Sequence, residues 1–161
     1  PTPHSVGLLS GDADEPGYSE GFRTESRYGS ELYVASAPDE GGRVIVLDRV
    51  NCALREVVLH GAPGSYLVRS YLLYGTPGQC YGPGSLANPT GPFSAWWSSG
   101  SSSTYGSGGG RILFMDDGEV MELDWASRSV KGTGVTSSTA VAGLAISDDG
   151  MTVSVVSTGD G

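Results

Sequence analysis

Lysine is almost absent from this chain of 161 residues: Lys131 is its one example, and charged residues of all kinds make up only 17% of the sequence. The formal net charge is -9, and the arginines are scattered along the chain. Binding to the phosphate backbone of nucleic acids relies on clustered lysine and arginine. This composition therefore argues against that class of partner, and we expect no nucleic-acid binding.

Long apolar runs are missing too. No run approaches the roughly 18 apolar residues that a membrane-spanning helix needs, so we expect no membrane span. No segment of ten residues has the spacing of an amphipathic helix. The chain instead holds 26 glycines and 9 prolines, and its 38% hydrophobic content is enough for the core of one domain. These features favour an all-β fold rich in tight turns.

Turn-forming residues divide the chain into short runs typical of strands. Asp117-Gly118 and Asp149-Gly150 are strong hairpin signals, because type I′ turns need positive φ at both central positions. Residues 44–47 are apolar throughout, which predicts a central strand covered on two faces. We expect antiparallel β-meander sheets, similar to propeller blades or to a sandwich. The predicted strands are 31–37, 43–48, 54–60, 65–74, 111–115, 119–125, 129–135, 141–147 and 151–157.

The predicted organisation is a single β domain, 1–161, in four parts. Residues 1–30 form an extended N-terminal segment, 31–74 a first β-meander, and 111–161 a second. Between the meanders, residues 75–110 are rich in Gly, Ser and Pro, which predicts an insertion without a long regular strand or helix. Its aromatic residues are predicted to form a contact surface, or to stack on sugar rings as in carbohydrate-binding modules. They are Phe93, Trp96, Trp97 and Tyr105.

The chain has two cysteines, Cys52 and Cys80, each beside a turn. We expect them to form a disulfide, which in an oxidising compartment would stabilise the fold by roughly 3–4 kcal/mol. Two free buried thiols are the alternative. A metal site at this pair is not expected, because His4 and His60 lack the spacing of metal ligands relative to it. The disulfide and the lysine-poor composition favour an extracellular or cell-surface location.

One phrase occurs twice: Gly-Arg-Val-Ile-Val-Leu-Asp at 42–48 and Gly-Glu-Val-Met-Glu-Leu-Asp at 118–124. Together with the run Gly-Leu-Ala-Ile-Ser-Asp-Asp-Gly at 143–150, it resembles the blades of YVTN-type and quinoprotein-type β-propellers. The resemblance covers 31–60 and 111–161. The two phrases lie further apart than a usual blade repeat of about 40–50 residues, and the excess matches the 75–110 insertion. Two to three blades do not close a ring, which typically needs four to eight.

The predicted last strand, 151–157, is followed by a turn at the end of the sequence. We expect the edge of this strand, with Met151, Val153 and Val155, to lack a partner within the chain, and an open edge is a template for pairing. The N-terminal segment has little structure of its own and holds a short apolar run that could pair there in a second subunit. This run includes Val6, Leu8 and Leu9.

The sequence has no clear catalytic or metal-binding motif. There is no Gly-x-Ser-x-Gly elbow, and either histidine would act as a base only if folding placed it beside a serine and an aspartate. Residues 12–20 have the alternating oxygen groups of a calcium loop, yet they lack the third aspartate and the closing glutamate of an EF-hand, so a solvated acidic turn is the favoured interpretation. We expect no cofactor, no bound metal and no enzymatic activity.

The function that these patterns favour is that of a secreted or cell-surface structural protein. Its subunits would form a homo-oligomer or polymer, such as a filament, sheath or surface layer, by exchange of strand edges or terminal segments. A carbohydrate-binding module that recognises glycans through the loop aromatics is one alternative. A fragment of a larger β-propeller protein or enzyme is another. The serine and threonine runs at 98–104 and 136–139 can also carry O-linked sugars, as in a glycoprotein.

Overall fold

The computed structural model of the protein describes residues 8–36, 43–60, 67–80, 89–97, 110–125, 127–137, 141–147 and 152–157. These residues form antiparallel β-sheets and one short 3-10 helix, η1 (Arg23–Glu25), so the all-β prediction is confirmed. In this part of the chain, no helix is long and apolar enough to cross a membrane.

The first sheet, sheet I, has five strands in the order β1-β5-β4-β3-β2. All neighbours are antiparallel. β3 lies in the middle of the β2-β3-β4 meander, and its Ile45, Val46 and Leu47 are buried, as predicted for a central strand. The strands are β1 (Gly21–Phe22), β2 (Leu32–Ser36), β3 (Arg43–Asp48), β4 (Ala53–His60) and β5 (Leu67–Gly75).

The second sheet, sheet II, has four strands in the order β6-β7-β8-β9. Asp117 and Gly118 join β7 to β8 and have φ values of 47° and 79°, which confirms the predicted positive-φ hairpin turn. A separate hairpin of β10 and β11 follows. The strands are β6 (Pro89–Trp97), β7 (Gly110–Asp116), β8 (Glu119–Asp124), β9 (Val130–Thr136), β10 (Val141–Ile146) and β11 (Val153–Ser157).

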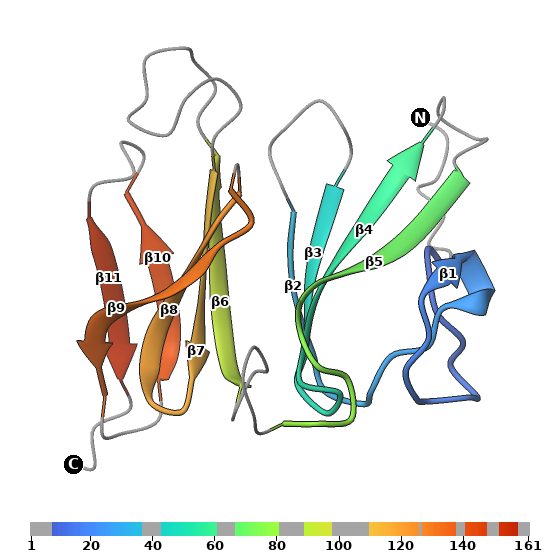
Figure 1. Ribbon diagram of the computed structural model, residues 1–161, viewed down its shortest axis with the longest axis horizontal. Helices are drawn as coiled ribbons and strands as arrows, with labels where there is room; N and C mark the ends of the chain where they lie inside the picture. Colours follow the sequence, from blue (N-terminus) through green and yellow to red (C-terminus); the bar gives the residue numbers. More distant parts are fainter. Residues whose placement is uncertain are drawn as a thin grey trace, which may run out of the picture.

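The sheets are arranged as successive layers (Figure 1). The segment 8–28, which includes β1, lies at one end, followed by sheet I, sheet II and the β10–β11 hairpin at the other end. The main core lies between sheets I and II and contains buried side chains from both. A second apolar cluster joins sheet I to Tyr28 of the segment 8–28, and a third joins sheet II to the hairpin. Each interface between layers is therefore closed by apolar packing.

The repeated phrase has the same structural role in both sheets. It forms β3 in sheet I and β8 in sheet II, and the strands on either side have the same register: Leu32 pairs with Asp48 as Arg111 pairs with Asp124. On the other side, Arg55 pairs with Val46 as Lys131 pairs with Glu122. The unit β2-β3-β4 thus corresponds to β7-β8-β9, except that the pairing of β8 with β9 shifts register between Glu119 and Met121. The further strands lie on opposite sides of this unit: β5 and β1 follow β4 in sheet I, and β6 lies beside β7 in sheet II.

The two repeated units meet through corresponding faces. Leu47 of sheet I and its counterpart Leu123 of sheet II lie in the same core, as do Ile45 and its counterpart Met121. The same face of each repeated unit therefore points into the shared core, which is the packing of a two-layer sandwich. In a propeller ring, the face of one blade would instead pack on the opposite face of the next blade. The hairpin instead packs on the outer face of sheet II. The relationship to propeller families stays a prediction.

The structure corrects the expectation for residues 75–110. Residues 89–97 form a strand, β6, although Pro89 and Pro92 lie in it. Proline is tolerated there because β6 is the edge strand of sheet II, so its missing N–H groups need not pair on both sides. The pairing with β7 is irregular between Pro89 and Phe93. β1 was not predicted, since it lies in the N-terminal segment that was expected to be extended, and the other strands match their predicted ranges within two residues at each end.

The predicted disulfide is confirmed. Cys52 and Cys80 are bonded, with their Cα atoms 5.2 Å apart, and both pack in the core between the sheets. Cys52 lies in the turn that follows β3, where its φ is 52°. The bond therefore ties this turn of sheet I to the segment that leads towards sheet II.

Candidate functional site

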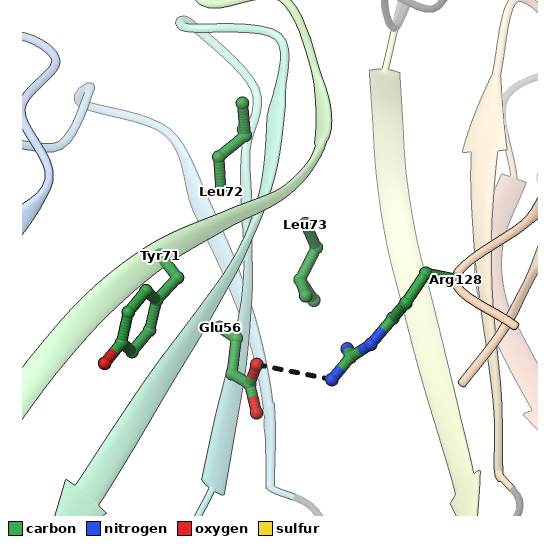
Figure 2. Close-up of a pocket in the computed structure, with 5 residues that line it drawn as sticks. All are labelled: Glu56, Tyr71, Leu72, Leu73 and Arg128. Atoms are coloured by element: carbon green, nitrogen blue, oxygen red, sulfur yellow. Dashed lines mark ion pairs between the residues drawn. The ribbon is translucent and has the colours of Figure 1, made fainter. Parts of the chain in front are cut away.

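A hollow of about 310 Å³ opens beside the interface of the two sheets (Figure 2). Its walls combine strands β4 and β5 of sheet I with the turn that follows β8 in sheet II. Figure 2 shows Arg128 reaching from this turn towards the carboxylate of Glu56 on β4. The lining residues are Glu56, Tyr71, Leu72, Leu73 and Arg128.

The hollow is organised around a group of charges on one tryptophan. Glu56 is 8% exposed, and its carboxylate lies 3.5 Å from Nε of Arg43 and 3.8 Å from the Arg128 guanidinium. Both guanidinium groups also lie over the ring of Trp125, at 5.2 Å for Arg43 and 3.5 Å for Arg128. The Glu56 carboxylate thus offsets the repulsion between two arginines that share one aromatic ring.

Burial lowers the pKa of Arg128, and the positive charge of Arg43 lowers it further, while Glu56 raises it. An arginine remains charged in spite of such a shift, so the group acts as a fixed ionic link. Because Glu56 belongs to sheet I and Arg128 to sheet II, the link spans the two layers. The hollow is lined by one carboxylate, one guanidinium, two leucines and a tyrosine, and its ionic link supports a role in holding the two sheets together.

The positive φ of Arg128, 58°, has a structural origin. In each repeat, the aspartate that ends the phrase accepts a hydrogen bond from the backbone N–H three residues later, at Asn51 for Asp48 and Ser127 for Asp124. The residue after that has positive φ in both cases, Cys52 in one and Arg128 in the other. The unusual backbone of Arg128 therefore belongs to a turn that the repeat uses twice, and it does not by itself mark a functional site.

A second charged group is buried on the outer face of sheet I. Asp48 and Arg55 are both fully buried, with 3.6 Å between carboxylate and guanidinium. Arg55 lies between the rings of Tyr18 and Tyr28, at 4.8 and 4.1 Å, and donates to the carbonyls of Ser19 and Arg27. Burial and then the hydrogen bond to Glu20 raise the pKa of Tyr18. This group fixes the segment 8–28 onto sheet I.

Sheet II has a related buried carboxylate at the position that corresponds to Val46. Glu122 is 2% exposed, pairs with Arg111, and lies 3.4 Å from Nζ of Lys131. Lys131 corresponds to Arg55 in the repeat. Both sheets therefore place one basic residue of the third strand of the meander, β4 or β9, close to an acidic partner on the neighbouring strand.

The predicted assembly residues lie in different environments, some packed against sheet II and some exposed. Val153 and Val155 pack against the outer face of sheet II, so their side chains are not available to a partner. Leu8 and Leu9 are exposed, at 59% and 40%, and lie outside any strand. The edge of β11 opposite β10 has no partner strand in the described residues. Val6 and Met151 lie outside the described residues.

The predicted aromatic surface is described only as backbone. Phe93, Trp96 and Trp97 lie on β6, which pairs with β7 and also runs close to β10 and β2. Their side chains, and the whole of Tyr105, lie outside what the structure describes. A contact or sugar-binding role for these residues stays a prediction.

The acidic turn at 12–20 is held by internal pairing. Asp12 accepts a hydrogen bond from the N–H of Asp14, and Arg27 pairs with Asp12 at 3.7 Å and Glu15 at 2.6 Å. Across the described ranges, no three His, Cys, Asp or Glu side chains are grouped as metal ligands. His60 is exposed at the end of β4, and His4 lies outside the described residues.

Sequence reasoning missed the ionic groups at Glu56 and Arg55. The sequence does contain a sign of them, because two opposite charges, Arg55 and Glu56, are adjacent inside the predicted strand 54–60. Adjacent side chains of a strand point to opposite faces of the sheet. Each of the two side chains is then buried in a different interface, which makes both of them structural. Trp125 is only 7% exposed, because the guanidinium groups of Arg43 and Arg128 lie over its ring.

Comparisons with protein-family models, with curated proteins and with solved structures found no match to this chain.

Replacing Glu56 with glutamine is expected to lower the free energy of unfolding by roughly 1–3 kcal/mol, since two partly buried arginines would lose their shared counter-charge. Urea unfolding followed by circular dichroism measures the change. The matched control is Glu31→Gln, which breaks the exposed pair of Glu31 with Arg49 and should cost at most about 1 kcal/mol. Equal costs for the two variants would contradict a structural role for the Glu56 group.

Proposed function

We propose that this protein is a non-enzymatic, extracellular or cell-surface structural protein whose subunits self-assemble. The observation that carries the proposal is that some faces of its sheets are covered by other parts of the chain, while others are exposed. Every interface inside the stack is closed by apolar packing, while sheet I and the β10–β11 hairpin each keep an exposed valine: Val34 of β2 is 62% exposed and Val156 of β11 is 60% exposed. Exposed apolar side chains on two different sheets of a layered β-protein favour the addition of further layers.

The chemistry of the rest of the molecule supports this proposal. The two buried ionic groups described above both act between layers of the chain itself. The disulfide fits an oxidising compartment, which is where secreted and surface proteins fold. β2 has no lysine and no proline, the residues that commonly protect an exposed edge from pairing.

Self-assembly predicts a mass that rises with protein concentration. We expect sedimentation velocity to show species larger than the monomer at high concentration and a return towards the monomer on dilution, and electron microscopy to show ordered polymers or rings. The disulfide must be kept oxidised, because reduction would alter the fold as well as the assembly. A chain that stays monomeric over the whole accessible range would contradict the proposal.

A further inference from the structure

The repeat shows which part of sheet I is left uncovered. Val34 pairs with Val46, and Leu113 pairs with Glu122, so the matching register makes Leu113 the counterpart of Val34. Leu113 is fully buried, whereas Val34 is 62% exposed. The difference has two causes: β6 pairs beside Leu113, and the β10–β11 hairpin covers the same face.

No described layer takes the place of the hairpin over β2. The segment 8–28 covers the outer face of sheet I at the β4–β5 side, where β1 pairs with β5 and Tyr28 packs on the cluster of Val57 and Val68. Leu32, two residues before Val34 on the same face, is 43% exposed. We call Leu32 and Val34 the β2 surface.

The outer face of the β10–β11 hairpin offers a surface that suits the β2 surface. Leu144, Ile146, Val153 and Val155 of the hairpin face sheet II. Alternation sends Ala145, Ser154 and Val156 to the opposite, outer face, and all three are exposed. These side chains are small, so the outer face of the hairpin is flat enough for another sheet to approach.

Neither surface carries a charge, which permits two copies of the chain to meet through them. The protein has a net charge of -9, so two copies repel each other unless they meet through uncharged surfaces. Neither β2 nor the described residues of the hairpin, 141–147 and 152–157, contain a charged side chain. Each copy therefore presents two uncharged surfaces, one on sheet I and one on the hairpin.

We propose that the outer face of the β10–β11 hairpin of one molecule packs on the β2 surface of the next, which specifies the contact in the self-assembly proposed above and rests on that proposal. In this contact, the hairpin of one copy covers sheet I of the next copy, just as the hairpin covers sheet II within one chain. The contact joins two different surfaces, so it is heterologous and repeats head to tail, as a filament or as a closed ring. Because it is apolar and acidic repulsion opposes it, added salt strengthens it.

The test uses two variants, each blocked at one end, Val34→Asp and Val156→Asp. The side chains are exposed, so both variants should fold, which circular dichroism and the urea midpoint verify. The expected result in sedimentation is that each variant alone stays monomeric at a concentration where the wild type assembles. An equimolar mixture forms a dimer of one copy of each, because each variant keeps the surface that the other lacks. The matched control, Val135→Asp on β9, changes a 41% exposed valine that belongs to neither surface, and this variant should assemble like the wild type.

The outcomes separate this contact from the broader proposal. If the wild type assembles and Val34→Asp assembles equally well, the contact is wrong while self-assembly stands. If Val156→Asp forms dimers alone and Val34→Asp does not, β2 pairs with β2 across a two-fold axis, and the head-to-tail contact is wrong. A wild type that stays monomeric overturns both proposals.

Discussion

Replacing Cys52 and Cys80 together with alanine is expected to lower the free energy of unfolding by about 3–4 kcal/mol. The two residues are 28 positions apart in sequence, so the bond restricts a loop of that size in the unfolded chain. That loop contains β4 and β5, and both sulfur atoms lie in the core between the sheets. Losing the bond should therefore weaken the arrangement of sheet I against sheet II.

The measurement is urea unfolding with and without a reductant. The wild type in reductant should approach the stability of the double variant, and the double variant should not respond to reductant at all. The single variants Cys52→Ala and Cys80→Ala control for lost packing: each should be destabilised by about as much as the double variant, since each already breaks the bond. A wild-type midpoint that does not move when both thiols are shown to be free would contradict this prediction.

The strands of the repeat could be predicted because their signals are local. The turn at Asp117-Gly118 requires positive φ, and residues 44–47 are apolar at every position, which identifies a strand covered on both faces. The disulfide was also predictable, because two cysteines allow one pairing. Local signals fix where strands begin and end, but they do not fix which face of one sheet packs on which face of another.

What was missed depends on contacts between distant segments. β6 has the composition of a loop, and it becomes a strand because β7 pairs with it on one side only. The partners of Arg55 come from residues 18–28, and Arg128 meets Glu56 across two sheets. Neither contact has a signature within a short window of sequence. The mapping of β2-β3-β4 onto β7-β8-β9 likewise required the observed register, although the phrase that defines it was visible in the sequence.

Replacing Asp48 with asparagine is expected to lower the free energy of unfolding by about 3–5 kcal/mol, because it leaves the charge of Arg55 buried without its carboxylate. Asp48 is fully buried and accepts hydrogen bonds from the N–H of Gly29 and from both the backbone and the side chain of Asn51. An amide presents only one oxygen in place of two, so some of these donors would also lose their partner. Urea unfolding measures the change.

The repeat provides a matched control for this variant. Asp124 occupies the corresponding position and accepts from the N–H and hydroxyl of Ser127 in an exposed turn. Asp124→Asn should therefore cost only about 1 kcal/mol, the usual value of a lost cap. If the two asparagine variants lost the same free energy of unfolding, the buried pair of Asp48 and Arg55 would contribute no more to stability than the exposed turn at Asp124.

Arg55→Met tests what the buried pair holds in place. Arg55 donates to the carbonyls of Ser19 and Arg27, whereas Asp48 keeps the donors of Gly29 and Asn51 when Arg55 is lost. We therefore expect the methionine variant to release residues 18–28 from sheet I, seen as faster amide hydrogen exchange there, while β3 and β4 stay protected. In a cycle with Asp48→Asn/Arg55→Met, a coupling of about 0.5–3 kcal/mol is expected for groups in contact. Additive effects would mean that each residue acts through its backbone partners alone, and that the ionic contact at 3.6 Å adds nothing to the attachment of the segment.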